Sequence, residues 1–255
     1  MEKIISGKHI NKWGILSLEI ISLFALIYGI FFFTATQALI AFILYAVITC
    51  FGIAIGYHRL LSHNSFKTSP LITKILSCIG CLSLQGSPLV WVINHRTHHA
   101  FTDTERDPHT PTNGILSAFF LGSFGTGKAS LGKDFLRDKF QLFLHKYYFL
   151  LIASYISIIY MFTNLGWTMT LIFAPAGGAW LAVNLVNTIG HLPYLGYKNH
   201  KLIDNSSNNI LVNLLSFGEG YHNNHHAEPN NSNFAHKPYE FDPSYYFIKI
   251  LQTND

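Results

Sequence analysis

The sequence is short of charged residues and of cysteine, and both shortages exclude classes of protein. Only 12% of its 255 residues are charged, against 49% that are hydrophobic, a balance too apolar for an ordinary soluble domain. The three cysteines lie inside apolar runs, so we expect no disulfide framework and interpret the single CxxC of Cys78 and Cys81 as packing residues. A net charge of +4 without a dense basic and aromatic stripe predicts no nucleic-acid partner.

Histidine is the residue that the sequence has in excess. Its 14 histidines outnumber its 13 acidic residues. Imidazole is the commonest protein ligand for transition metals and a frequent proton-transfer group. The excess therefore points to metal or proton chemistry.

Four apolar runs predict membrane-spanning helices, since about 20 residues at a rise of about 1.5 Å each cross a bilayer. The runs are residues 15–33, 38–57, 147–162 and 167–189. Short connections at 34–37 and 163–166 pair them into two hairpins. Pro175, Gly177 and Gly178 are expected to kink the fourth helix. The fold class that follows is an all-α integral membrane protein.

Basic residues set the expected orientation. Of the 17 lysines and arginines, three precede the first span, ten lie within residues 59–146 and four follow residue 191. None lies in the tips of the two hairpins. The positive-inside rule then places both termini and the long central segment in the cytoplasm.

The segments outside the spans predict a helical cap on that side. Residues 71–92 and 114–127 are apolar but too broken to cross, so we expect helices along the membrane surface. Residues 133–146 mix apolar and charged side chains and predict an amphipathic interfacial helix. We therefore expect one domain over residues 1–255, with a cytoplasmic cap formed by 58–146 and 190–255.

Three histidine clusters lie on the inferred cytoplasmic side. They are HRLLSH with His58 and His63, HRTHH with His95, His98 and His99, and HNNHH with His222, His225 and His226. In a helix, HxxHH spacing places three imidazoles on one face, where they can serve one metal pair. His58 and His63 reach the same centre only if their helix continues beyond the bilayer.

His191 is a ninth candidate, at the end of the fourth span, with Asn187 one turn before it. Histidine content alone does not select among iron, zinc, copper and nickel. The other histidines are isolated and are expected to have surface or core roles; they are His9, His109, His145, His200 and His236.

HRLLSH, HRTHH, GEGYHNNHH and NTIGH resemble the histidine boxes of the membrane fatty acid desaturases, specifically the stearoyl-CoA (Δ9) type. FTDTERDPH and DPSYYFIKIL extend the resemblance to Lys249. The resemblance implies two iron ions (Fe2+) and O2 as co-substrate, with Asn187 touching metal through water. The histidines that it implies as ligands are His58, His63, His95, His98, His99, His191, His222, His225 and His226.

The same resemblance implies an enzyme that introduces a cis double bond, at Δ9, into a saturated acyl chain. Ile93 and Asn94 are uncharged where the animal acyl-CoA enzymes tend to carry an Arg-Asp pair, which leaves the carrier open between CoA and a membrane lipid. With no fused cytochrome b5 motif, the expected electron donor is a separate ferredoxin, rubredoxin or cytochrome b5-like protein with its reductase. These traits are typical of a bacterial inner-membrane enzyme.

Carboxylates beside the boxes are candidates to accept the free ring N–H of a ligating histidine. We single out Glu219 and Asp107, with Asp103, Glu105 and Glu228 also nearby, and a solvated loop charge is the alternative for each. Phe42 and Ala46 share a helix face three to four turns before His58 and are candidates for the end of an acyl tunnel. Ordinary packing or contact with lipid is the alternative for both.

Two other functions fit the same motifs. A lipid hydroxylase would use a similar centre and insert oxygen in place of removing a second hydrogen. A histidine-rich metal transporter is the rival from another class, but transporters place their ligands near the middle of the membrane on broken helices. The boxes here lie at helix ends and beyond.

Overall fold

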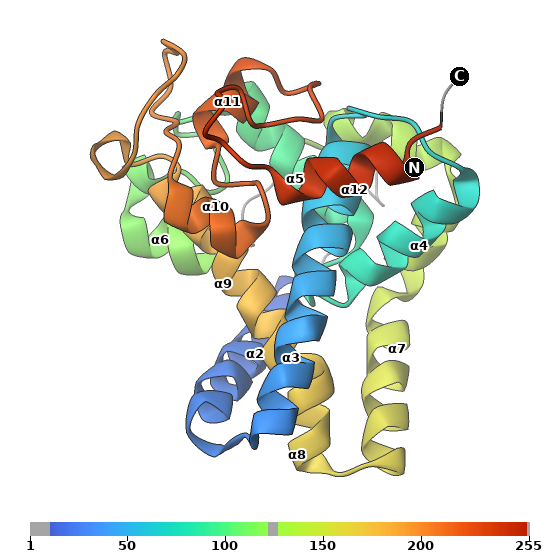
Figure 1. The fold of residues 1–255 in the computed structure, drawn as a ribbon. Coiled ribbons are helices and arrows are strands. Elements are labelled where there is room, and N and C mark those ends of the chain that lie inside the picture. The colour runs from blue at the N-terminus through green and yellow to red at the C-terminus, as the bar shows by residue number, and fades with distance from the viewer. Residues whose placement is uncertain (1–10, 122–126, 254–255) are drawn as a thin grey trace.

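The structure is a computed structural model that describes residues 11–121 and 127–253. Over these two ranges it is helical with no strand, and the only extended pairings are three isolated bridges (Figure 1). This confirms the expected all-α class.

Four helical rods are long and apolar enough to cross a membrane, as expected. They are α2 (Lys12–Phe32), α3 (Ala35–Val47) continued by η1 (Ile48–Ser62), α7 (Lys139–Phe162), and α8 (Leu165–Thr168) continued by η5 (Met169–Phe173) and α9 (Ala174–Ile189). The rods lie together in one half of the molecule and the shorter helices gather at one end of them (Figure 1).

Side-chain hydrogen bonds cap the second helix of each hairpin, and both helices begin earlier than the sequence predicts. Thr34 and Gln37 form a capping box, in which the Gln37 amide donates to Thr34 Oγ1 at 3.3 Å and the Thr34 amide donates to Gln37 Oε1 at 3.1 Å. Helix α3 therefore begins at Ala35, and residues 35–37 are helical where we expected a loop. Asn164 caps α8 in the same way, accepting from the Trp167 amide at 3.0 Å.

The second rod is longer than the bilayer core requires. An α-helix needs about 20 residues to cross a core of about 30 Å at about 1.5 Å per residue, and this rod has 28. His58 lies near its end. The last 15 residues, Ile48–Ser62, form a π-helix, a rare arrangement that often marks functional sites.

The fourth rod has a π-helical turn in place of a simple proline kink. Met169–Phe173 forms this turn just before Pro175, which occupies one of the first two positions of α9. Proline lacks an amide hydrogen, and the change of helical register absorbs the missing bond. Gly177 and Gly178 lie within regular helix.

One sequence expectation about the surface helices is wrong. Residues 133–146 do not form one amphipathic helix, because Asp138 caps a new helix by accepting from the Phe140 and Gln141 amides at 2.8 and 3.2 Å. The 3-10 helix η4 (Ala129–Arg137) precedes this cap, and α7 runs from Lys139 straight into the span. Residues 71–92 are helical as expected, in α4 (Pro70–Cys81) and the start of α5 (Pro88–Phe101).

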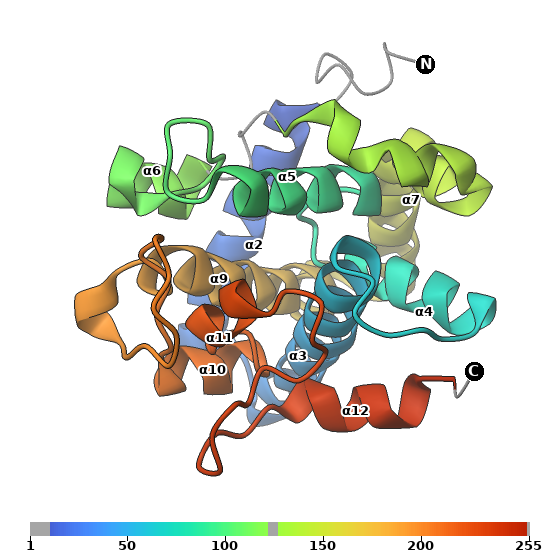
Figure 2. The same ribbon diagram turned by 90° about the horizontal axis from the view of Figure 1, so that it is seen from above.

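The shorter helices form a cap over one end of the rods. Besides α4 and α5 they include α6 (Ile115–Leu121), α10 (Ile210–Ser216), α11 (His222–Ala227) and α12 (Pro243–Leu251). Seen from above, α5, α10 and α11 lie around the upper ends of η1 and α9 (Figure 2). Leu71, Leu116, Leu211 and Ile250 are 66% to 78% exposed on four of these helices. Apolar exposure of this kind is typical of helices that lie on a membrane surface.

Close contact between α2 and α9 depends on Gly177. A Cβ at this position would lie 2.3 Å from the carbonyl oxygen of Ser22. Small residues at such crossings allow helix backbones to approach in a membrane. The predicted kink glycine is thus a packing residue.

We expect Gly177→Ala to lower the free energy of unfolding by about 1–3 kcal/mol, because the added methyl group overpacks the crossing and forces α2 and α9 apart. Gly166→Ala is the matched control, since its Cβ would meet nothing closer than 3.3 Å. Thermal unfolding of the detergent-solubilised proteins compares the two. Equal stabilities would contradict the packing role.

Candidate metal centre

All nine histidines proposed from the sequence converge into two groups of ring nitrogens. The five-histidine group contains His58, His63, His95, His99 and His225, and the four-histidine group contains His98, His191, His222 and His226. Within each group the candidate ligand nitrogens all lie within 4.8 Å of one another. The groups adjoin, since the rings of His99 and His226 stack with centroids 4.5 Å apart.

Each HxxHH segment divides its histidines between the two groups. On α5, His95 and His99 enter the five-histidine group and His98 enters the other. At about 100° per residue, i+4 and i+3 lie on either side of residue i, about 40° and 60° around the helix axis. On α11 the division is reversed, because the i and i+4 pair of His222 and His226 enters the four-histidine group and His225 enters the five-histidine group.

The π-helix brings His58 and His63 together. The His63 amide donates to the His58 carbonyl at 3.2 Å, an i→i+5 bond. This register stacks residues five apart, and the two ring centroids lie 4.9 Å apart. In a regular α-helix the same spacing would aim the rings apart. Because the second rod is long and ends in a π-helix, His58 and His63 both reach the five-histidine group.

The nitrogen spacing fits shared metal ions better than hydrogen bonds between rings. His225 Nε2 lies 3.0 Å from His58 Nε2 and 2.8 Å from His99 Nε2. A ring nitrogen offers either one N–H or one lone pair, so it cannot satisfy both contacts as hydrogen bonds. Nitrogens at about 2.0–2.1 Å from one metal ion lie about 2.9 Å apart at right-angled coordination. The residues present therefore fit a metal ion in each group.

The four-histidine group has similar spacing. His191 Nε2 and His222 Nε2 are 2.9 Å apart, and His98 Nε2 lies 3.2 Å from His226 Nε2. The side chains of this group are almost fully enclosed, with His191 2% exposed and His98 1% exposed. Enclosure of this kind excludes bulk water from a bound ion.

Burial favours the neutral form of several ligand candidates. Burial, together with the positive charges of Arg96 and Arg59, lowers the pKa of His63 to about 3. Burial also holds the pKa of His95, His98 and His225 well below its ordinary value. Neutral imidazole has a free lone pair, and metals bind only this form.

Carboxylates orient four of these rings through Nδ1. Glu219 bonds His58, and Asp107 Oδ2 lies 2.8 Å from His98 Nδ1, which are the two partners singled out in the sequence. Asp103 Oδ2 lies 3.2 Å from His191 Nδ1. Such contacts fix the tautomer that leaves Nε2 free to bind metal. Of the remaining candidates, Glu105 is exposed, and Glu228 lies 3.9 Å from His236, which belongs to neither histidine group.

The carboxylates differ in their electrostatics. Burial raises the pKa of Glu219 to about 8 and that of Asp107 to about 6. Burial also acts to raise the pKa of Asp103, but its bonds to His191 and the Asn205 amide outweigh this and lower it to about 2. A cation bound at the histidines would favour the charged form of all three.

Sequence reasoning missed Asp204. Its Oδ2 lies 3.2 Å from Nδ1 of His226, which makes it the fourth orienting carboxylate. Asp204 lies in an irregular loop far from every histidine box, and no periodicity or motif marks it. Only the folded loop places it beside α11.

The two asparagines inside HNNHH were also missed, and they anchor the box from behind. Asn223 Oδ1 accepts from the His200 amide at 2.8 Å, while Asn224 donates to the Phe234 carbonyl and to Glu240, both at 2.8 Å. Both side chains are fully buried. They point away from the histidine face and fix the rotation of α11, so that three rings face the site.

Asn187 lies beside the histidines, as its place before His191 suggested. It lines a polar cavity of about 50 Å³ with His95 and His109, and a second cavity of about 30 Å³ with His58 and His222. Either cavity has room for at least one water, which needs about 10–15 Å³. A water between Asn187 and a metal ion therefore fits the space.

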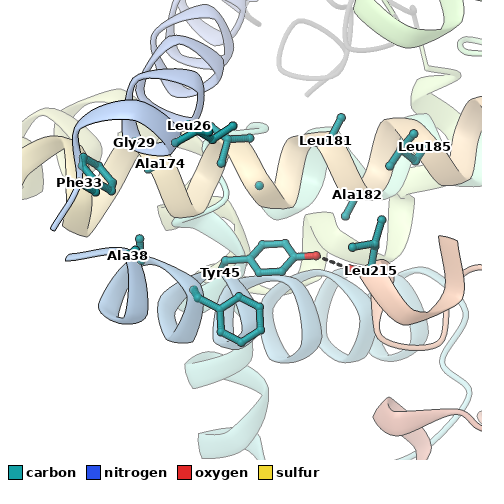
Figure 3. A pocket seen from close by; sticks show the side chains of 14 residues that line it. Leu26, Gly29, Phe33, Ala38, Tyr45, Ala174, Leu181, Ala182, Leu185 and Leu215 are labelled. Atoms are coloured by element: carbon teal, nitrogen blue, oxygen red, sulfur yellow. Dashed lines mark hydrogen bonds between the residues drawn. The ribbon is translucent and has the colours of Figure 1, made fainter. Parts of the chain in front are cut away.

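The tunnel candidates fall in different places. Phe42 lines a larger apolar groove between α3 and its neighbours (Figure 3), whereas Ala46 lines neither that groove nor the two small cavities.

Among the isolated histidines, His109 is buried and stacks on His98 with centroids 4.4 Å apart, and His200 pairs with His236. His145 contacts Ser87, and His9 lies outside the described residues.

The sequence profile described as fatty acid desaturase matches residues 34–239. Among similar proteins, the sn-1 stearoyl-lipid 9-desaturase of Anabaena variabilis is 32% identical over 95% of this chain and 90% of its own length. The sn-2 palmitoyl-lipid 9-desaturase of Nostoc sp. (strain 36) is 33% identical over 79% of this chain and 73% of its own length. The acyl-CoA 5-desaturase AL21 of Anemone leveillei is 32% identical over 82% of this chain and 67% of its own length.

We expect His225→Ala to reduce the metal bound per chain to about half, because the five-histidine group loses the nitrogen that contacts two others. Elemental analysis of purified, reconstituted protein measures this content. His200→Ala is the control, since its ring pairs with His236 at 2.9 Å outside both groups. Equal metal content in the two variants would refute this ligand assignment.

We expect Asp204→Ala to weaken metal affinity by about 10–100-fold, because His226 loses the partner that fixes its tautomer. Competition against a chelator of known affinity measures the change. Glu228→Ala removes a carboxylate just after the same box that touches neither group, and its affinity should equal that of the unaltered protein. A normal affinity in Asp204→Ala would show that His226 needs no such partner.

Proposed function

The chain belongs to the fatty acid desaturase family, and we propose that it uses O2 to introduce a cis double bond at Δ9 of a saturated acyl chain. As a member of this family it is an oxidoreductase of fatty acyl chains. The observation that carries the proposal is the convergence of nine imidazoles into two adjoining groups at the end of the apolar rods. The names of the two similar 9-desaturases support the position.

We assign one iron ion to each histidine group, which makes the nine histidines ligands and Asn187 a partner through water. Bound iron supplies the oxidising power that activates O2 against an unactivated methylene. The protein's own part is to hold nine lone pairs in place and to exclude water from them. His225, His98 and His191 are 0% to 2% exposed, which fits that part.

The reaction needs electrons from outside. Removing two hydrogen atoms from adjacent methylenes forms the double bond, and O2 takes up these two hydrogens with two electrons and two protons to give two waters. No redox group of the polypeptide supplies the electrons. We therefore propose a separate donor, a ferredoxin, rubredoxin or cytochrome b5-like protein with its reductase.

We propose that the reacting methylenes lie at the 30 Å³ cavity. Ile53 of η1 and Val186 of α9 line it from opposite rods, and His58, His95 and His222 line it from the metal side. Its apolar side chains and ligand rings, beside the polar side chains of Thr49, Ser216 and Glu219, would hold an alkyl segment against the centre, which is the positioning that this reaction requires. Dehydrogenation at a fixed methylene follows from that constraint.

We propose a membrane lipid as the acyl carrier. Ile93 is buried against Gly132, and Asn94 lines the polar 50 Å³ cavity, so neither offers a charge for a CoA group. Two similar proteins are named as acyl-lipid desaturases. The basic residues on the cap side support a multi-pass protein with its cap in the cytoplasm. We propose a bacterial inner membrane as its location.

Expression in a host without its own desaturase should produce acyl chains two hydrogens lighter, with the double bond at Δ9. Mass analysis of the lipid classes identifies the product and its carrier. His99→Ala should form no product yet remain in the membrane, because His99 belongs to the five-histidine group and the apolar rods are unchanged.

Other products would decide against parts of the proposal. A gain of one oxygen with no double bond would identify a hydroxylase. Unsaturation confined to the acyl-CoA pool would refute the lipid carrier. Unchanged product in His99→Ala would refute the role of the histidine groups.

A further inference from the structure

The guanidinium of Arg96 joins three helices beside the five-histidine group. Arg96 lies on α5, directly after His95. Its Nε donates to the carbonyl of Ser62 at 2.8 Å, and one terminal nitrogen donates to the carbonyl of Leu61 at 2.9 Å, both on η1. The other terminal nitrogen donates to the carbonyl of Leu131 on η4 at 2.8 Å. The side chain thus connects the end of the second rod with α5 and η4.

Asp134 of η4 completes these contacts. Its two carboxylate oxygens accept from the two terminal nitrogens of Arg96 at 2.7 and 2.9 Å, which is the bidentate geometry of strong arginine–carboxylate pairs. Arginine has five N–H donors, and the five bonds use every one of them. We call these five bonds the Arg96 network. Lysine has three donors on a single nitrogen and cannot replace this set.

The Arg96 network holds carbonyls that η1 itself leaves without partners. Leu61 and Ser62 are the last residues of η1, and the carbonyls at the end of a helix have no acceptor role within it. His63 follows Ser62 directly, so the bonds to these carbonyls also fix the backbone from which the His63 ring extends.

The network spans the same two elements as a pair of ligand candidates. The Nε2 atoms of His63 and His95 lie 2.8 Å apart, one from the end of the second rod and the other from α5. Each of these histidines is next in sequence to a member of the network, Ser62 or Arg96. The network therefore sets the distance between the two rings.

Only one of the two histidine groups depends on this distance. Helix η1 supplies His58 and His63, and both belong to the five-histidine group. The four-histidine group takes its members from α5, from the end of α9 and from α11. A shift of η1 away from α5 would therefore open the first group and leave the second in place.

Exposure makes the Arg96 network the restraint that breaks most readily. The side chain of Arg96 is 17% exposed and that of Asp134 is 52% exposed. Arg59, which holds the other side of η1, is 0% exposed, and its partner Asp242 is 1% exposed. An exposed ion pair contributes little stability, whereas breaking a buried one is costly.

The charge of Asp134 also matters to a bound cation. The positive charge of Arg96 acts on His63, so a metal ion at His63 would be repelled by an unpaired guanidinium. Asp134 neutralises that charge. Loss of Asp134 would therefore free the Arg96 side chain and leave its charge unpaired beside the ion.

We propose that Arg96 is a positioning residue that closes the five-histidine group, and that its pair with Asp134 sets how long this group retains its metal ion. When the pair breaks, the end of η1 moves away from α5 and His63 leaves the ion. The inference rests on the metal centre of the proposed function. It adds that the two ions are retained by different contacts.

The test measures the release of Fe2+ from anaerobically reconstituted protein to an excess of chelator, in two backgrounds that each keep one group intact. His222→Ala removes a member of the four-histidine group, so the remaining ion lies in the five-histidine group, and His225→Ala does the reverse. In the His222→Ala background, Arg96→Gln should speed release by about 10–100-fold, the loss typical when a partner of a metal ligand is removed. Asp134→Asn should speed it by about 2–5-fold, as for an exposed ion pair. In the His225→Ala background neither change should alter the rate.

Two further variants separate position from charge. Arg137→Gln is the control, because it removes an exposed arginine at the end of the same helix η4, and it should leave release unchanged in both backgrounds. Arg96→Lys keeps the charge and loses the five-donor set, and in the His222→Ala background it should release Fe2+ faster than the chain with Arg96.

The outcomes separate this inference from the function on which it rests. Unaltered protein that retains no Fe2+ would refute the metal centre and the proposed function with it. Retained Fe2+ with the same release rate in Arg96→Gln, Asp134→Asn and the control would refute this inference alone. Equal acceleration in both backgrounds, or an unchanged rate in Arg96→Lys, would also refute it. If Arg96→Gln does not fold, Asp134→Asn decides, because it changes only a half-exposed side chain.

Discussion

The buried guanidinium of Arg59 holds the third histidine segment against the second membrane rod. It pairs with Glu219 at 3.0 Å and Asp242 at 2.7 Å, and donates to the Ser232 carbonyl at 2.9 Å. Glu219 and Ser232 lie on either side of the HNNHH box, so one side chain secures both ends of that segment. A fully buried charge is stable only when it is paired and hydrogen-bonded, and these contacts supply both.

The same network connects the fold to the chemistry. Glu219 bonds both Arg59 and His58, so the residue that anchors the C-terminal segment also orients a metal-ligand candidate. Behind α11, Asn223 and Asn224 bond to loops on its far side. The histidine groups are thus held from two directions, which keeps their rings close together.

Helical register positions the histidine rings of this site as much as residue type does. The π-helix at the end of the second rod stacks His58 and His63, and regular α-helix on α5 and α11 divides each HxxHH between two groups. The second rod continues from α3 into this π-helix. One continuous helix therefore links the apolar rods to the proposed metal site.

The sequence by itself determined the four apolar rods, the candidate ligands and the carboxylates Glu219 and Asp107, because hydropathy and box spacing are local properties of the chain. It did not determine the π register of residues 48–62, which depends on packing and not on any residue type. Only the tertiary structure decided which histidine joins which group, and only it placed Asp204 and Asp134. Their partners are distant in sequence, at His226 and Arg96, and a contact between remote segments leaves no periodic trace in the chain.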